Sequence, residues 1–194
     1  MSFDKRLLLP SLVIAFGMVL VLAAAWLTFS GPGAPPPSSI GGPFQLTDQN
    51  GRSITQDDLK GAPTVIFFGY THCPDVCPTT LFEVTQLFKK LGDNAKINGA
   101  FVTVDPERDT AELLRDYLSS FDPRIRGLTG TQAQLEPMLK AYRVFARKVP
   151  GADGGPYTMD HSAIVYLMDK QMRFVGPLNI GDDDVALKEL RKWM

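Results

Sequence analysis

The chain has 194 residues, a formal net charge of −1 and 44% hydrophobic residues. This length suits one globular domain of about 150 residues with additional segments outside it. The near-zero net charge gives no reason to expect nucleic acid as a partner.

The N-terminal part of the chain reads as a single transmembrane helix. Residues 7–29 carry no charge, and a helix of about 20 apolar residues crosses a hydrocarbon core of roughly 30 Å. Lys5 and Arg6 precede the span, which places residues 1–6 in the cytoplasm and the remainder across the membrane. A cleaved signal peptide is the alternative, since residues 23–25 are small, but the apolar stretch exceeds the usual length of about 7–15 residues.

The compartment follows from the same segment. An Arg-rich, Ser-rich transit peptide is absent, which favours a bacterial inner membrane over an organelle. The rest of the protein is then periplasmic. Residues 30–43 are rich in proline and glycine and are expected to form a semi-extended linker. Residues 44–194 are expected to fold as one domain.

The first predicted elements of this domain are a hairpin, a central strand and a helix. The Asn-Gly pair at 50–51 lies between short alternating segments in residues 44–55 and predicts a tight hairpin. Residues 64–69 form a continuous β-branched and aromatic run, which is typical of a central strand covered on both faces. Residues 78–91 carry apolar side chains at helical spacing, and Gly92 suits the helix end.

Strands and helices then alternate. Residues 100–104 are the next predicted strand. Asp109 and Glu112 have N-cap and N3 spacing and predict a helix that extends to Phe121. Residues 126–130 predict a short strand or a turn. This alternation is typical of a parallel α/β sheet.

The C-terminal third is less regular. Thr131 can cap a further helix, but Pro137 removes a hydrogen bond from its interior, so a kink or a later helix start is expected. The remaining predicted elements are a weak strand at 143–149, a glycine-rich loop at 150–157, an antiparallel hairpin of residues 162–168 and 171–175, and a final helix that begins at residues 182–184.

Both cysteines and one of the two histidines lie in residues 71–78, directly after the predicted central strand. Pro78 suits the first position of a helix, so Cys77 is predicted to be the N-cap. A thiol there faces the positive end of the helix dipole, which would lower its pKa and favour the thiolate. A disulfide between Cys73 and Cys77 would close too short a loop to stabilise the fold much.

Thiolates attack disulfides and bind soft metals, so two chemistries are open. Two thiolates and an imidazole from elsewhere in the chain would suit Cu(I) and could also hold Cu(II) or zinc. His72 adjoins Cys73 and points the opposite way on an extended chain. His161 precedes a predicted strand, and from the residues alone it is as readily an exposed loop histidine as a ligand.

Two carboxylates are candidates for orienting His161 or tuning the thiolates. Asp105 and Asp160 each lie at the end of a predicted strand or loop. Each also has an ordinary alternative, because aspartate at such positions commonly hydrogen-bonds its own turn.

The order of elements is that of a thioredoxin-like domain, an α/β sheet flanked by helices with an N-terminal hairpin. Three separate segments carry a closer resemblance: residues 69–80, residues 104–110, and residues 160–162 before an apolar strand. Together they resemble the Sco/SenC family of copper-binding proteins, across essentially all of residues 40–194 and the membrane anchor.

The resemblance implies the ligands, the function and the partners. Cys73, Cys77 and His161 match the family's copper ligands. The expected function is a membrane-anchored copper chaperone that delivers copper to the binuclear copper centre of cytochrome c oxidase. The expected partners are the copper-bearing subunit of that oxidase, an extracytoplasmic copper donor and a thiol reductant.

Two other functions stay open. A thiol–disulfide reductase could keep the cysteines of the copper acceptor reduced, with Cys73 and Cys77 as its reactive pair. The Cys-x-x-x-Cys spacing and the lack of proline at residues 158–161 argue against a general oxidoreductase, so the chain is not expected to be primarily an enzyme. A redox or copper sensor is a third, weaker interpretation.

Overall fold

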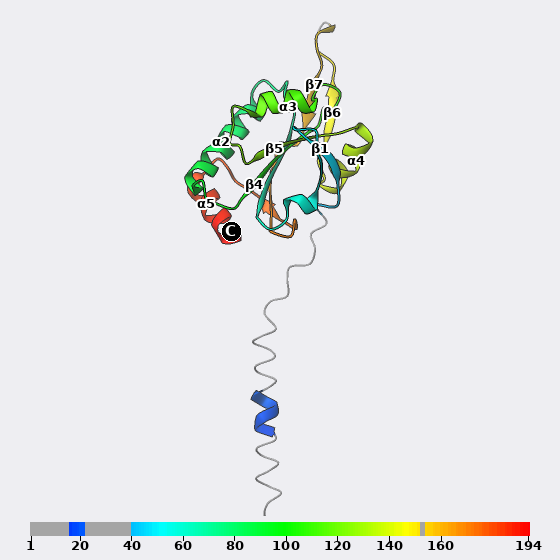
Figure 1. The fold of residues 1–194 in the computed structure, drawn as a ribbon. Coiled ribbons are helices and arrows are strands. Elements are labelled where there is room, and N and C mark those ends of the chain that lie inside the picture. The colour runs from blue at the N-terminus through cyan, green and yellow to red at the C-terminus, as the bar shows by residue number, and fades with distance from the viewer. Residues whose placement is uncertain (1–15, 22–39, 152–153) are drawn as a thin grey trace, which may run out of the picture. The chain divides into compact units, whose positions relative to one another are not determined.

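The computed structural model describes residues 16–21, 40–151 and 154–194 (Figure 1). Residues 16–21 are helical. The rest of the transmembrane span predicted for residues 7–29 lies outside the described residues, as does most of the linker predicted for 30–43. Within the described ranges, no helix is both long enough and apolar enough to cross a membrane. The anchor and its orientation therefore stay predictions.

The domain is built on a seven-stranded sheet of order β2-β1-β5-β4-β3-β8-β9. Its strands are β1 (Gln45–Asp48), β2 (Ser53–Thr55), β3 (Thr64–Gly69), β4 (Asn98–Thr103), β5 (Ile125–Thr129), β8 (Val165–Met168) and β9 (Phe174–Pro177). The central strands β3, β4 and β5 are parallel, and the outer pairs are antiparallel. Helical crossovers join the parallel strands, as the alternation of strand and helix in the sequence predicts.

Helices cover both faces of this sheet. They are η1 (Gln56–Leu59), α2 (Val76–Leu91), α3 (Ala111–Leu118), α4 (Gln132–Ala141) and α5 (Asp183–Trp193). Phe67 of β3 packs beside Phe101, which in turn contacts Tyr117 of α3, with ring centroids 6.0 and 5.8 Å apart. Phe68 points to the opposite face, where its ring lies 5.6 Å from that of Tyr142, just after α4. The predicted central strand, covered on both faces, is confirmed.

A second, two-stranded sheet consists of β6 (Ala146–Val149) and β7 (Thr158–His161). Strand β6 confirms the weak strand predicted for 143–149. Strand β7 was not predicted, because its short and mostly polar sequence lacks the alternation of a half-buried strand. As a result His161 ends a strand instead of lying in a loop, and β8 starts at Val165 instead of residue 162.

The start of α2 corrects one prediction. The N-cap is Asp75, and the helix begins at Val76. Cys77 is therefore the second residue of the helix and not its N-cap, and Pro78 is the third. Proline is tolerated there because the backbone N–H groups of the first turn have no partner within the helix.

Two further helix starts differ from or refine the predictions. Helix α3 is capped by Thr110, whose hydroxyl accepts the N–H of Leu113 at 3.2 Å, and not by Asp109. Helix α4 starts directly after Thr131, which forms a capping box with Gln134. The late start that Pro137 suggested is therefore wrong, because the capping box fixes the first turn ahead of the proline.

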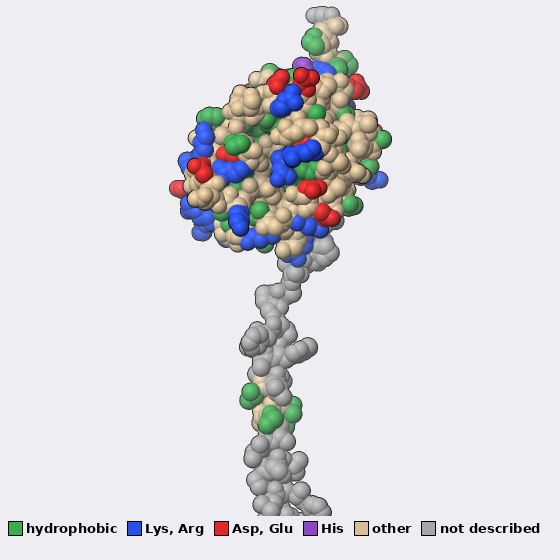
Figure 2. Space-filling view, in the orientation of Figure 1, with side chains coloured by type: hydrophobic (Ala, Val, Ile, Leu, Met, Phe, Trp, Pro, Cys, Tyr) green, Lys and Arg blue, Asp and Glu red, His purple; other side chains and the backbone are tan. Residues whose placement is uncertain are grey.

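On the face of the domain shown in Figure 2, Lys and Arg side chains are interspersed with Asp and Glu side chains. Apolar side chains on this face are scattered among them. The candidate ligands Cys73 and Cys77 lie beyond the end of β3, in the segment of residues 71–78.

Candidate metal site

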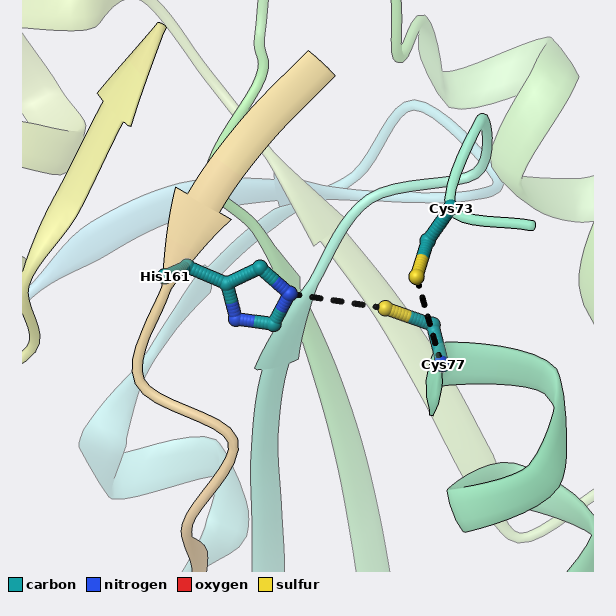
Figure 3. Close-up of side chains that lie close together, drawn as sticks. All are labelled: Cys73, Cys77 and His161. Atoms are coloured by element: carbon teal, nitrogen blue, oxygen red, sulfur yellow. Dashed lines mark hydrogen bonds between the residues drawn. The ribbon is translucent and has the colours of Figure 1, made fainter. Parts of the chain in front are cut away.

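Three side chains from three parts of the chain meet beyond the end of β3 (Figure 3). Cys73 lies in the loop after β3, Cys77 in the first turn of α2, and His161 at the end of β7. Their ligand atoms all lie within 4.8 Å of one another. Nε2 of His161 is 3.6 Å from Sγ of Cys77, although the two residues are 84 positions apart in sequence. The structure thus brings together the three residues that the sequence nominates as ligands.

The turn between the cysteines places both sulfurs on the same side. The backbone N–H of Cys77 points at Sγ of Cys73, with a distance of 3.4 Å from nitrogen to sulfur. The N–H of Cys73 donates to the carbonyl oxygen of Tyr70 at 3.3 Å. The side chain of the N-cap residue Asp75 makes no capping hydrogen bond, and one free N–H of the helix start points instead at the sulfur of Cys73.

The ring of His161 is oriented for binding through Nε2. Its Nδ1 lies 3.1 Å from the carbonyl oxygen of Ser162. A carbonyl only accepts, so Nδ1 carries the hydrogen, and the lone pair of the neutral ring is left on Nε2. Such a hydrogen bond from the other ring nitrogen is the usual device that fixes a histidine ligand. Nε2 faces Cys77, as Figure 3 shows.

The environment of Cys77 corrects the prediction of a lowered pKa. Its side chain has no solvent exposure. Burial raises the pKa of the Cys77 thiol above its usual range, and this outweighs the opposite effect of a hydrogen bond from the backbone of Tyr70. Burial therefore opposes the activation expected at a helix start, because desolvation disfavours the charged thiolate.

Access to the site is one-sided. Cys73 and His161 are partly exposed, Cys77 is buried, and both cysteines are free thiols. A metal could therefore be approached from the side of Cys73 and His161. The opposite side is closed by the core, where Cys77 packs.

The two carboxylates nominated to assist the site have other partners. Asp105 is buried, accepts the Tyr157 hydroxyl at 2.8 Å and pairs with Arg108. Asp160 is exposed and pairs with Arg147 at 3.3 Å. In the described part of the chain, neither carboxylate hydrogen-bonds to the two cysteines or to the histidine. Asp105 acts on the loop that leads into β7, and a direct effect of either residue on a metal stays a prediction.

His72 stands apart from this group. Its side chain is half exposed, and its Nδ1 lies 3.0 Å from the hydroxyl of Thr71. It also lies 3.9 Å from a carboxylate oxygen of Asp109. His72 is therefore the neighbour of Cys73 in the chain, but its side chain does not belong to the group of three ligand atoms.

Asp109 has a role that its N-cap spacing did not suggest. Its carboxylate is fully buried. One oxygen accepts the Thr71 hydroxyl at 2.6 Å, and the other accepts the Thr71 backbone N–H at 3.1 Å and the Thr103 hydroxyl at 2.6 Å. Asp109 thereby fastens the cysteine loop to the end of β4, two residues ahead of Cys73.

Replacing Asp109 by asparagine is expected to lower the free energy of unfolding by about 1.5–3 kcal/mol, the usual range for hydrogen bonds to a charged group. The amide offers one acceptor oxygen where the carboxylate offers two. Denaturant unfolding measures the change. Asp116→Asn on the exposed face of α3 is the control and should stay within about 0.5 kcal/mol of wild type. Equal stability of the two variants would contradict the role given to Asp109.

Comparison with known proteins identifies the family. The sequence model of the SCO1/SenC family matches residues 32–194. The chain belongs to the SCO1/SenC family. This confirms the resemblance found in the sequence.

Individual SCO1/SenC proteins extend the comparison. A solved structure of Bradyrhizobium japonicum ScoI with copper bound is 54% identical, with a TM-score of 0.76, and the match covers 80% of this chain and 99% of that chain. This likeness confirms the thioredoxin-like α/β fold of the domain. The SCO2-like protein RP587 of Rickettsia prowazekii is 37% identical over 200 residues, which span 97% of this chain and 94% of the relative.

A mitochondrial relative is longer than this chain. The protein SCO2 of Saccharomyces cerevisiae is 40% identical over 161 residues, which span 79% of this chain but 52% of the yeast protein. The chain thus matches about half the length of that relative.

Proposed function

We propose that this SCO1/SenC protein is a copper chaperone that delivers copper to the binuclear copper centre of cytochrome c oxidase during its assembly. The observation that carries the proposal is the convergence of Cys73, Cys77 and His161, whose ligand atoms lie within 4.8 Å of one another. The copper-bound state of Bradyrhizobium japonicum ScoI supports copper as the metal.

The donor set fits copper on chemical grounds. Sulfur donors select soft ions such as Cu(I), and an imidazole nitrogen suits both Cu(I) and Cu(II). Three donors leave at least one side of the metal free. Because Cys73 and His161 are partly exposed, an acceptor thiolate could reach that side and share the copper before the donor releases it. Ligand exchange of this kind never exposes a free ion.

The oxidase as recipient is supported by family membership and by the proposed placement of the chain. An anchor at residues 7–29 and a linker at 30–43 would keep the domain close to the periplasmic face of the inner membrane, where it could reach a membrane-bound oxidase subunit. A copper donor and a thiol reductant complete the proposed set of partners.

A second candidate function is reduction of a disulfide in the acceptor. The observation that favours it is the pairing of a partly exposed thiol, Cys73, with a buried one, Cys77. In such a reaction the Cys73 thiolate attacks the acceptor disulfide and forms a mixed disulfide. Cys77 then displaces the acceptor, which leaves with both of its sulfurs reduced, while Cys73 and Cys77 become the new disulfide. That oxidised form has lost both thiolate ligands, so redox state would control copper binding.

Copper titration of the full chain, purified in detergent and kept reduced, tests the proposal. We expect one copper ion per chain. His161→Ala should weaken Cu(II) affinity by about 100-fold, since metal sites in proteins derive roughly 3 kcal/mol from each ligand. His72→Ala is the matched control and should bind as wild type does.

Two results would overturn the proposal in different ways. If His161→Ala binds copper as tightly as wild type, the three-ligand site is wrong. If the wild-type chain binds no copper but readily reduces a disulfide-bonded peptide, the reductase function replaces the chaperone.

A further inference from the structure

The two halves of the candidate metal site lie on parts of the fold that do not share a sheet. Cys73 and Cys77 follow β3 of the main sheet, whereas His161 ends β7. In the described part of the chain, β7 pairs only with β6, in a sheet separate from the main one. Backbone hydrogen bonds of the main sheet therefore do not fix the strand that carries His161. Other contacts must set the separation of its imidazole from the two sulfurs.

The turn of residues 105–109 is fixed to the main sheet and to the cysteine loop. Val104, directly before the turn, donates its N–H to the carbonyl oxygen of Gly69, the last residue of β3, at 2.8 Å. The N–H of Asp109 donates to the carbonyl oxygen of Asp105 at 3.0 Å, which closes the turn. The carboxylate of Asp109 accepts hydrogen bonds from the cysteine loop. The turn therefore keeps a constant place relative to the cysteine half of the site.

Arg108, the neighbour of Asp109 in this turn, contacts the start of β7. Its Nη1 donates to the carbonyl oxygen of Tyr157, directly before β7, at 2.9 Å. The centre of its guanidinium lies 3.8 Å from the centroid of the Tyr157 ring, which is within the range of cation–π attraction. Its Nε pairs with the buried carboxylate of Asp105. One planar guanidinium therefore joins the turn to the residue that leads into the strand of His161.

Tyr157 and Lys148 add contacts between the β6–β7 hairpin and the same turn. The hydroxyl of Tyr157 donates to Asp105 at 2.8 Å. Lys148 of β6 pairs with Glu107, and its Nζ lies 4.8 Å from the centroid of the Tyr157 ring. Both members of the Lys148–Glu107 pair are exposed, so this pair contributes little. The contacts of Arg108 and Tyr157, which end on a buried carboxylate, are the stronger part of the connection.

Arg108 also borders the ring that packs on His161. The centre of its guanidinium lies 5.7 Å from the centroid of the Tyr70 ring, and Tyr70 is 3% exposed. The rings of Tyr70 and His161 meet edge-on, with centroids 5.8 Å apart and planes at 89°. A displacement of Arg108 would therefore act both on the start of β7 and on the ring against which the imidazole packs.

We propose that Arg108 is a positioning residue that holds β7 to the turn of residues 105–109 and so sets the separation of His161 from the two thiols. The inference rests on the proposed copper site, because Arg108 would hold one ligand of that site. Arginine suits this position because its planar fork can donate to a carboxylate and a carbonyl while its face stacks on a ring. Arg108 acts on copper only through these neighbours. Two adjacent residues of one turn then hold the two halves of the site, Asp109 the cysteine loop and Arg108 the histidine strand.

A double-mutant cycle with the full chain and Cu(II) tests this role. Arg108→Lys keeps the positive charge beside Asp105 but removes the fork that reaches Tyr157, and it should weaken Cu(II) affinity about 10-fold, as loss of a residue that orients a metal ligand usually does. In a His161→Ala background the same change should cost less than about twofold, because the ligand that Arg108 positions is already gone. A merely structural arginine would cost the same in both backgrounds, and that result would overturn the inference.

Tyr157→Phe is a second variant at the same connection. It removes the hydrogen bond to Asp105 and keeps the ring that Arg108 covers. The loss of Cu(II) affinity should be smaller than in Arg108→Lys and should again depend on the presence of His161. Wild-type Cu(II) affinity in both variants would overturn the inference.

Arg124→Lys supplies the matched control. The side chain of Arg124, like that of Arg108, is 19% exposed and pairs with a buried aspartate, here Asp122 at 2.8 Å. Arg124 also donates to a backbone carbonyl oxygen, that of Gly92, at 2.9 Å. Gly92 ends α2, whereas Cys77 lies in the first turn of that helix, on the order of 20 Å away along its axis. Arg124→Lys should leave Cu(II) affinity unchanged, and a loss equal to that of Arg108→Lys would overturn the inference.

Hydrogen exchange of the copper-free protein separates this inference from the proposed function. The peptide of residues 157–161 should take up deuterium about 10-fold faster in Arg108→Lys and at the wild-type rate in Arg124→Lys. An unchanged rate in Arg108→Lys would overturn the inference even if the wild-type chain binds copper. Failure of the wild type to bind copper, in contrast, would overturn the proposed function, while the exchange rates would still decide whether Arg108 holds β7.

Discussion

Cys77→Ser is expected to weaken Cu(I) binding by about 1000-fold or more. Serine keeps the size of the side chain but replaces a soft sulfur by a hydroxyl that does not ionise at neutral pH, and Cu(I) selects soft thiolate donors. Loss of one ligand costs roughly 3–4 kcal/mol of metal-binding free energy. We expect the upper end of that range or more for Cys77, because its sulfur faces Nε2 of His161 at 3.6 Å. Competition with a chromophoric Cu(I) chelator measures the change.

Cys73→Ser is a second test of the same site, and Thr80→Ser is the control. Cys73→Ser should cause a loss of similar size, because its sulfur belongs to the same group. Thr80 is buried on the same helix, and its hydroxyl and methyl groups take no part in that group. Thr80→Ser should therefore bind Cu(I) as wild type does. Wild-type affinity in Cys77→Ser would mean that copper binds elsewhere.

Much of the fold follows from local patterns in the sequence. The Asn-Gly pair gives the β1–β2 hairpin, and the continuous apolar run of residues 64–69 gives the fully buried strand β3. Both signals depend on residues that are neighbours in the chain, so they do not depend on the long-range contacts of the domain. Strand β7 has no such signal, because it forms by pairing with β6 and not from a pattern within its own four residues.

The candidate ligands of the site could be predicted from the sequence, but the burial of Cys77 could not. The cysteines stood out by their concentration in one segment, whereas His161 was ambiguous until the resemblance to Sco/SenC proteins was considered. The pKa of Cys77 was misjudged because the helix start is a local feature and burial is not. Cys77 is buried in the same core cluster as Phe67 of β3 and Phe101 of β4, and the pattern of residues 71–78 does not predict that burial.

Asp109 shows the same limit in another way. Its spacing to Glu112 matches a helix start, but the carboxylate is used 38 positions away in sequence, at Thr71. The residue pattern of one helix cannot reveal a hydrogen bond to a residue so distant in sequence. Tyr70 is a similar case, since its position directly before the cysteine segment can be read from the sequence but the packing of its ring against that of His161 in β7 cannot.

Gly69→Ala is expected to lower the free energy of unfolding by about 3 kcal/mol and to weaken copper affinity about 10-fold. A Cβ at Gly69 would lie 2.7 Å from Cε2 of Phe101, 2.8 Å from Sγ of Cys77 and 3.1 Å from Cε1 of Phe67. These side chains are fully or almost fully buried and cannot move aside freely. Overpacking of a dense core typically costs about 1–3 kcal/mol, and here one of the displaced atoms is a proposed ligand.

Gly176→Ala in β9 is the control, because a Cβ there would meet no atom within 4 Å. Its stability should stay within about 1 kcal/mol of wild type and its copper affinity should not change. Thermal unfolding and copper titration of both variants separate the two consequences of Gly69→Ala. A large loss of stability with wild-type copper affinity would show that Cys77 Sγ keeps its place while the phenylalanines yield, and that Gly69 serves the core and not the metal site.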